Sequence, residues 1–170
     1  MKLLVCLLII VSVVLAPASA GAFADLTRAV VVSPASLSGP EKKAVVMLRE
    51  EVEKRTQILW QTAQGWPADD VPVIAVGPAS SLNAFAGKWA SRLAADRGVA
   101  GAEEGYRIRV VKDRAAPTVF VVGNDARGVL FGLGHLLRSL HICDSDSSEY
   151  PDCGRGPKGR QEIGPAVRPG

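Results

Sequence analysis

Two runs of apolar, β-branched residues, separated by a long amphipathic segment, constrain the fold of this 170-residue chain more than any other feature. The first run, residues 28–33, has three consecutive valines, and the second, residues 71–77, contains three more. Apolar residues without alternation are typical of strands that are covered on both faces of a sheet. The sequence therefore predicts buried strands with helices packed on them.

The segment between the two runs is predicted to be a helix that lies on the sheet. Ser38 and Glu41 form a capping-box pattern at its start. The helix is expected to reach about Thr62, before Gly65 and Pro67 end it. Its apolar stripe is predicted to comprise Val45, Leu48, Val52 and Leu59.

The rest of the chain adds two helices and a hairpin. Strands at residues 106–111 and 118–122 are close enough in sequence to form an antiparallel hairpin. Asn124 or Asp125 can cap a last helix with a broad apolar face. The earlier helix is indicated by apolar residues at spacings of three or four, namely Leu82, Phe85, Trp89 and Leu93. The order β-α-β-α-β-β-α predicts one α/β (α+β) domain over residues 21–142, a mixed sheet with packed helices.

The first 20 residues have the features of a secretory signal peptide. A short positive end precedes the apolar run at residues 3–15, and residues 18–20 supply the small-x-small cleavage pattern. A retained membrane anchor is the less favoured alternative, because a span needs about 20 apolar residues. We expect cleavage after Ala20, and hence a secreted or periplasmic protein without a stable membrane anchor.

Residues 143–170 are predicted to be an irregular tail, polar at first and then rich in Gly and Pro. Cys143 and Cys153 lie in this tail, and in an oxidising compartment they can form a disulfide. The alternatives are a free pair and, less favoured, a reactive or metal-binding thiol.

The charge of the chain argues against a nucleic-acid partner. Without Lys2, which would leave with the signal peptide, 19 of the 20 basic residues remain against 17 acidic ones. A nucleic-acid-binding domain would show a clustered basic face, whereas these residues are scattered along the chain, except in the tail at residues 155–168, which is expected to be a solvated segment.

None of the candidate clusters makes a complete active site. Glycoside hydrolysis needs two carboxyl groups about 5–9.5 Å apart across a cleft. The adjacent carboxylates lie on an exposed helix side, before a strand or in loops; they are Glu50 with Glu51, Asp69 with Asp70, Glu103 with Glu104, and Asp144 with Asp146. His135 and Ser139 lack a carboxylate to orient the imidazole. The spacing of His141, Cys143, Asp144, Asp146 and Cys153 matches no zinc pattern. We therefore predict no catalytic residue, no metal and no cofactor.

Two residues are weak candidates for binding. Trp66, between Gly65 and Pro67, is the tryptophan expected to be most exposed, and sugars stack on exposed aromatic faces. Arg127 lies in a strand-to-helix segment, residues 123–128, where a helix terminus can bind an anion. The alternative is structural: Asp125 caps the helix and Arg127 pairs with a carboxylate within the domain or across a domain boundary. Gly128 and Gly132, on one helix face, would then allow close approach to the sheet. Trp89 is expected in the core, and Trp60 in the core or at its rim.

Three segments carry a resemblance to a known family. Residues 41–56 end in Leu-Arg-Glu-Glu-Val-Glu-Lys-Arg-Thr, which resembles a helix in the N-terminal domain of bacterial family 20 β-hexosaminidases and α-glucuronidases. Residues 104–108, Glu-Gly-Tyr-Arg-Ile, and residues 121–132, Val-Val-Gly-Asn-Asp-Ala-Arg-Gly-Val-Leu-Phe-Gly, are similar to the hairpin and last helix of that domain. The resemblance extends over residues 26–140, with the element order in agreement.

The resemblance implies a non-catalytic accessory domain. In those enzymes a catalytic (β/α)8 barrel of about 250 residues follows the domain, whereas here 30 residues follow Leu140. We expect a truncated or stand-alone relative that is not active alone, with a glycoside hydrolase barrel or a carbohydrate as its partner. A secreted carbohydrate- or protein-binding module is the alternative, and a small glycosidase is less favoured.

Overall fold

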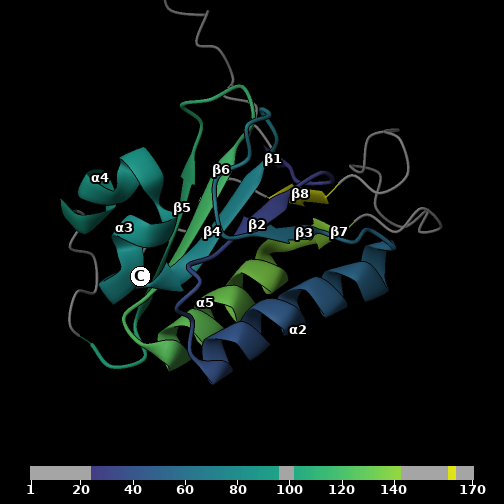
Figure 1. Ribbon diagram of the computed structural model, residues 1–170. Coiled ribbons are helices and arrows are strands. Elements are labelled where there is room, and N and C mark those ends of the chain that lie inside the picture. Colours follow the sequence, from purple (N-terminus) through teal and green to yellow (C-terminus); the bar gives the residue numbers. More distant parts are fainter. Residues whose placement is uncertain (1–23, 96–101, 143–160, 164–170) are drawn as a thin grey trace, which may run out of the picture.

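The computed structural model describes residues 24–95, 102–142 and 161–163 (Figure 1). The predicted signal peptide, Cys143 and Cys153 lie outside these residues. Of the segment predicted to be an irregular tail, the described residues include a short strand, β8 (Gln161–Ile163). The prediction that this segment contributes no element of the domain is therefore wrong.

A five-stranded mixed sheet forms the centre of the domain, as the α/β prediction requires. Its strands lie in the order β3 (Gln61–Ala63), β2 (Val30–Val32), β4 (Val73–Pro78), β6 (Thr118–Gly123) and β5 (Tyr106–Val111). The pairs β3–β2, β2–β4 and β4–β6 are parallel. β5 and β6 are antiparallel and form the predicted hairpin.

A second, three-stranded sheet lies beside the first. β8 pairs antiparallel with both β1 (Ala24–Asp25) and β7 (Leu140–Ile142), so the order is β1-β8-β7. This small sheet joins the beginning of the described chain to its last segment.

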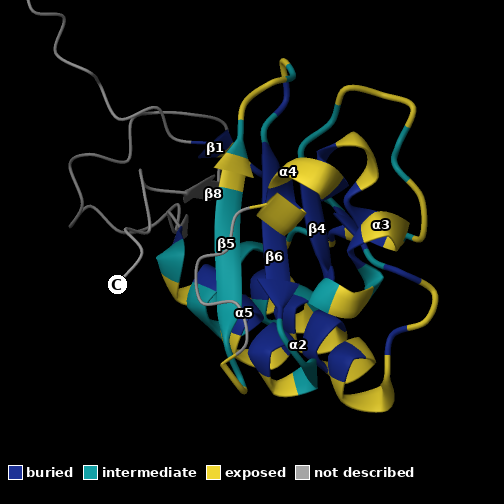
Figure 2. Cartoon of the chain, turned by 90° about the vertical axis from the view of Figure 1, so that its left-hand side faces the viewer, coloured by how far each residue is buried: buried dark blue, intermediate teal, exposed yellow. Residues whose placement is uncertain are grey.

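Helices cover both faces of the central sheet (Figure 1). The long helices α2 (Gly39–Thr56) and α5 (Ala126–Ser139) pack side by side on one face. The short helices α3 (Leu82–Phe85) and α4 (Ala90–Ala95) lie on the other face. Every residue of β4 and β6 is buried as a result, whereas β5 at the edge is only half-buried for most of its length (Figure 2). This explains the uninterrupted apolar runs in the sequence.

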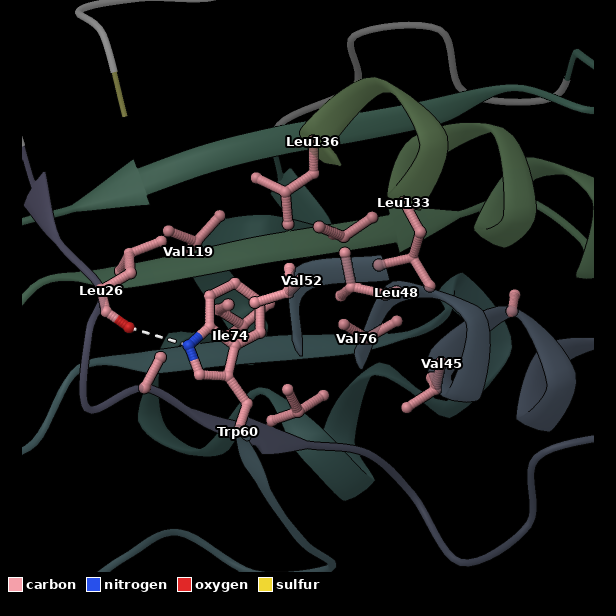
Figure 3. Packing of buried hydrophobic residues seen from close by; sticks show 14 of the residues in the cluster. Leu26, Val45, Leu48, Val52, Trp60, Ile74, Val76, Val119, Leu133 and Leu136 are labelled. Atoms are coloured by element: carbon pink, nitrogen blue, oxygen red, sulfur yellow. Dashed lines mark hydrogen bonds between the residues drawn. The ribbon is translucent and has the colours of Figure 1, made fainter. Parts of the chain in front are cut away.

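The larger of two apolar clusters lies between the sheet and the two long helices (Figure 3). Trp60 is at its centre, 1% exposed, and its indole Nε1 donates a hydrogen bond to the carbonyl oxygen of Leu26 at 2.9 Å. Val52 of α2 and Leu136 of α5 pack in the same cluster. The smaller cluster lies under α3 and α4, around Phe85 and Phe120.

The predicted end of the first helix is wrong by six residues. α2 stops at Thr56, whose hydroxyl donates to the carbonyl of Val52 at 2.7 Å, and Gln57 follows in a left-handed conformation with φ of 60°. The turn places Trp60 in the core and leaves Leu59 49% exposed, so Leu59 does not belong to the apolar stripe. Residues 61–63 form β3 instead of continuing the helix. Burial of the Trp60 indole stabilises this arrangement more than a longer helix with Leu59 in its apolar stripe would.

The second predicted helix is broken into short pieces. α3 and α4 are separated by a 3-10 turn at Gly87–Trp89, where Gly87 has a positive φ of 54°. The indole of Trp66 lies 3.0 Å from the position of a Cβ on Gly87, which explains why glycine occupies this site. The predicted apolar residues are nevertheless all buried, namely Leu82, Phe85, Trp89 and Leu93.

Candidate functional site

The motif at the start of α5 is built around one carboxylate. Asp125 caps the helix, as predicted: its Oδ1 accepts from the amide of Gly128 at 2.7 Å. Its Oδ2 accepts from the amide of Glu104, in the loop before β5, at 2.8 Å. These amides, that of Glu104 first, lower the pKa of Asp125 below its ordinary value, because they stabilise the charged form. Asp125 therefore links the loop before β5 to the helix.

Arg127 is paired within the domain. Its guanidinium lies 2.5 Å from Oε1 of Glu104, although its side chain remains 71% exposed. Glu104 itself has a positive φ of 62°, which turns the loop toward the helix. The structure thus agrees with the structural alternative for Arg127, and its charge is already compensated by a carboxylate.

Gly132 brings α5 against the sheet, as predicted, whereas Gly128 brings it against the loop before β5. A Cβ on Gly128 would overlap the carbonyl oxygen of Gly105. A Cβ on Gly132 would lie 2.7 Å from a methyl group of Val121 and 3.2 Å from the Cβ of Tyr106. Asp125, Gly128 and Gly132 therefore make capping or packing contacts, whereas Leu130 and Phe131 of the same segment are exposed.

The three tryptophans form no exposed sugar platform. Trp60 and Trp89 are buried, at 1% and 6% exposure. Trp66 is the most exposed of the three, as predicted, yet it is half-buried. Its indole Nε1 donates to the carbonyl of Phe85 at 3.0 Å, and its ring lies 4.8 Å from that of Trp89. Trp66 offers part of one ring to a ligand.

Neighbouring charges hold three of the candidate carboxylates. Glu51 pairs with Arg55 at 2.5 Å along α2, and Asp70 pairs with Arg114 at 2.9 Å. With Glu104 bound to Arg127, each candidate pair within the described residues has a member in an ion pair. Asp144 and Asp146 lie outside those residues.

The histidine on α5 has a partner other than the predicted serine. Nδ1 of His135 lies 2.7 Å from the hydroxyl of Tyr106, and the rings meet edge to face. Ser139 donates to the backbone carbonyl of His135 at 3.0 Å, so its hydroxyl is not directed at the imidazole. In residues 24–95 and 102–140, no cluster of three or more His, Cys, Asp or Glu side chains has a geometry suited to a metal ion. The same residues contain no helix long and apolar enough to cross a membrane.

An apolar groove runs along the outer surface between α2 and α5; we call it the docking groove. It has a volume of about 430 Å³. Met47 on one side and Leu130 on the other are 49% and 40% exposed, and Phe131 beside Leu130 is 41% exposed. Its wall is otherwise apolar or small, with three charged residues at the α2 edge; the lining is Ala44, Met47, Leu48, Glu50, Glu51, Lys54, Leu130, Leu133, Gly134 and Leu137.

The sequence contained a signal for this groove in apolar residues outside the predicted stripe of the first helix. Val46 and Met47 follow Val45 directly, so apolar residues extend around α2 beyond the face that a single sheet can cover. Leu130 and Phe131 do the same on α5. Exposed apolar residues gathered in one place are typical of interaction sites.

Comparison with known proteins does not assign the chain: no protein-family model matches it, and no curated protein is similar enough to count as a match.

Proposed function

We propose that the chain is a secreted, non-catalytic accessory domain that docks through the groove between α2 and α5 on another protein module. The observation that carries the proposal is the exposure of Met47 and Leu130 in the wall of one apolar groove, with the exposed Phe131 next to Leu130 in the sequence. Each of these side chains is already about half-buried, so completing its burial would contribute about 1 kcal/mol. A groove of this kind suits a protein surface better than a polar sugar.

The resemblance to the accessory domains supplies the kind of partner, a glycoside hydrolase barrel. The ion pairs of Glu51, Asp70 and Glu104 support a non-catalytic role, because an arginine of the same domain already engages one member of each described carboxylate pair. Sequencing the genomic DNA beyond the codon for Gly170 tests whether a hydrolase-like frame, and so a candidate partner, is encoded there. The absence of a hydrolase-like frame there would count against a truncated gene.

Docking is tested by titrating the secreted chain with a barrel module encoded beside it. Met47→Glu places a charge in the groove and should weaken binding at least tenfold, since that charge would be buried without a partner. Asn83→Glu is the matched control, because Asn83 is an exposed residue of α3 on the opposite face. The docking proposal fails if the two variants bind equally well.

A carbohydrate-binding module is the second candidate function. The half-exposed ring of Trp66, with the guanidinium of Arg114 at 6.0 Å from its centre, is the observation in its favour. Titration with chitin- and xylan-derived oligosaccharides tests it, with Trp66→Ala as the variant. Flat binding curves for the unmodified chain would exclude this candidate.

A further inference from the structure

A second groove lies at the carboxyl ends of β2 and β3. It has a volume of about 430 Å³ and is bounded by the loop after β2, the end of β3 and the first half of α2. We call it the anion groove. The residues that matter to its chemistry are Ser33, Pro34, Lys42, Val46, Arg49 and Thr62.

The topology of the sheet favours a ligand at this end. The chain leaves β2 toward α2 on one face of the sheet and leaves β4 toward α3 on the other face. The two connections therefore diverge at the carboxyl ends of these neighbouring strands. Open α/β sheets bind their ligands beside such a point. Here the ring of Pro34 fills the space next to β4: its Cδ lies 3.1 Å from the point that a Cβ would occupy if Gly77 had a side chain. The remaining opening is on the side of α2.

Two cations face this opening. Lys42 and Arg49 are seven residues apart on α2, which places them two turns apart on the same side of the helix. None of the residues that line the groove is acidic. The groove therefore has a local charge of +2 in a domain whose overall charge is nearly balanced.

Arg49 is held in position while its terminal nitrogens remain available. Its Nε donates to the carbonyl oxygen of Trp60 at 2.8 Å, which fixes the half-buried side chain against the loop before β3. Within the described part of the chain, neither Nη1 nor Nη2 has a hydrogen-bond partner. A fixed guanidinium of this kind is suited to a planar carboxylate, and a lysine beside it adds a point charge.

The remainder of the groove is largely apolar. Pro34 and Val46 contribute carbon surface, and Val46 is 37% exposed. The polar groups at the β3 side are the hydroxyl of Thr62 and the amide of Gln64, both on exposed residues. We propose that the anion groove binds a small organic carboxylate with an apolar body, its carboxylate between Lys42 and Arg49 and its body over Pro34 and Val46.

Benzoate is a suitable probe, with benzyl alcohol as its neutral analogue and inorganic phosphate as an anion without an apolar body. Titrations of the secreted chain, followed by the amide NMR signals of Thr62 and its neighbours, should show binding of benzoate at millimolar concentration. Binding should weaken as salt is added. Benzyl alcohol and phosphate should each bind at least fivefold more weakly. Binding of benzyl alcohol or phosphate as strong as that of benzoate, or no shift with benzoate, would overturn the proposal.

Lys42→Met should weaken benzoate binding at least fivefold. Lys43→Met is the matched control, since Lys43 is exposed on the same helix but does not line the groove, and it should change binding less than twofold. Equal effects of the two substitutions would refute the assigned site. Met47→Glu, which tests docking, should leave benzoate binding unchanged, so failure of one proposal is distinguishable from failure of the other.

Discussion

Gly128 is the position in α5 where an added methyl group should reduce stability most clearly. In Gly128→Ala the new Cβ would overlap the carbonyl oxygen of Gly105, a backbone atom that cannot rotate away. Helix and loop must then separate, which stretches the hydrogen bond from Glu104 to Asp125. Gly134→Ala on the same helix is the matched control, because its Cβ would meet only the guanidinium of Arg138 at 3.6 Å.

The two substitutions should change stability in opposite directions. Replacing a helical glycine by alanine stabilises by about 0.5–1 kcal/mol where there is space, as at Gly134. Overpacking costs about 1–3 kcal/mol, so Gly128→Ala should be destabilised by about 1–2 kcal/mol net. Thermal unfolding followed by circular dichroism should show a Tm lowered by about 3–8 °C for Gly128→Ala and raised for Gly134→Ala. If Gly128→Ala is as stable as Gly134→Ala, the close approach of helix and loop is not as described.

Three further predictions concern the core, the helix cap and export. Trp60→Phe removes the indole hydrogen bond to Leu26 and leaves a small cavity, so urea unfolding should show a loss of about 2–3 kcal/mol. The lowered pKa of Asp125 means that its carboxylate stabilises the fold at neutral pH. That contribution is lost as pH falls below the ordinary value of 3.8 and through the lower pKa of the folded state. Asp125→Asn should therefore be less stable at pH 7, and a gap to the unmodified protein that does not narrow in acid would contradict this assignment. Mass spectrometry of the exported protein should find Gly21 at the N-terminus, whereas an intact N-terminus in the membrane fraction would indicate a retained anchor.

Elements defined by local patterns could be predicted from the sequence. The capping positions of Ser38 and Asp125, the valine-rich strands and the hairpin all depend on residues that are near neighbours in the chain. The close approach of Gly128 and Gly132 was also predictable, because their spacing places both on one helix face. These features required no knowledge of distant contacts.

Elements that depend on distant contacts could not be predicted in the same way. β3 exists because Trp60 reaches Leu26, 34 residues earlier in the chain, and no local pattern reports that contact. β8 has three residues, which are too few to show a periodic pattern. Its partners, β1 and β7, come from opposite ends of the domain. The second bond of Asp125, to the amide of Glu104, likewise joins residues 21 positions apart.

The two grooves show the same limit for the candidate site. The docking groove arises where two helices, each with apolar residues beyond its sheet-facing side, come to lie in parallel contact. The anion groove combines Lys42 and Arg49 of α2 with Thr62 of β3, a strand that the helical pattern of the sequence concealed. The extra apolar residues of α2 and α5 indicate an uncovered surface, but the position of either groove depends on how the fold brings its elements together.

Turnover of aryl glycosides by the purified chain tests the non-catalytic role most directly. No product above the uncatalysed rate is expected from aryl N-acetylglucosaminides, glucuronides or xylosides, because arginines of the domain engage Glu51, Asp70 and Glu104. Sustained hydrolysis that disappears in Glu104→Gln, while the variant remains folded, would contradict the account.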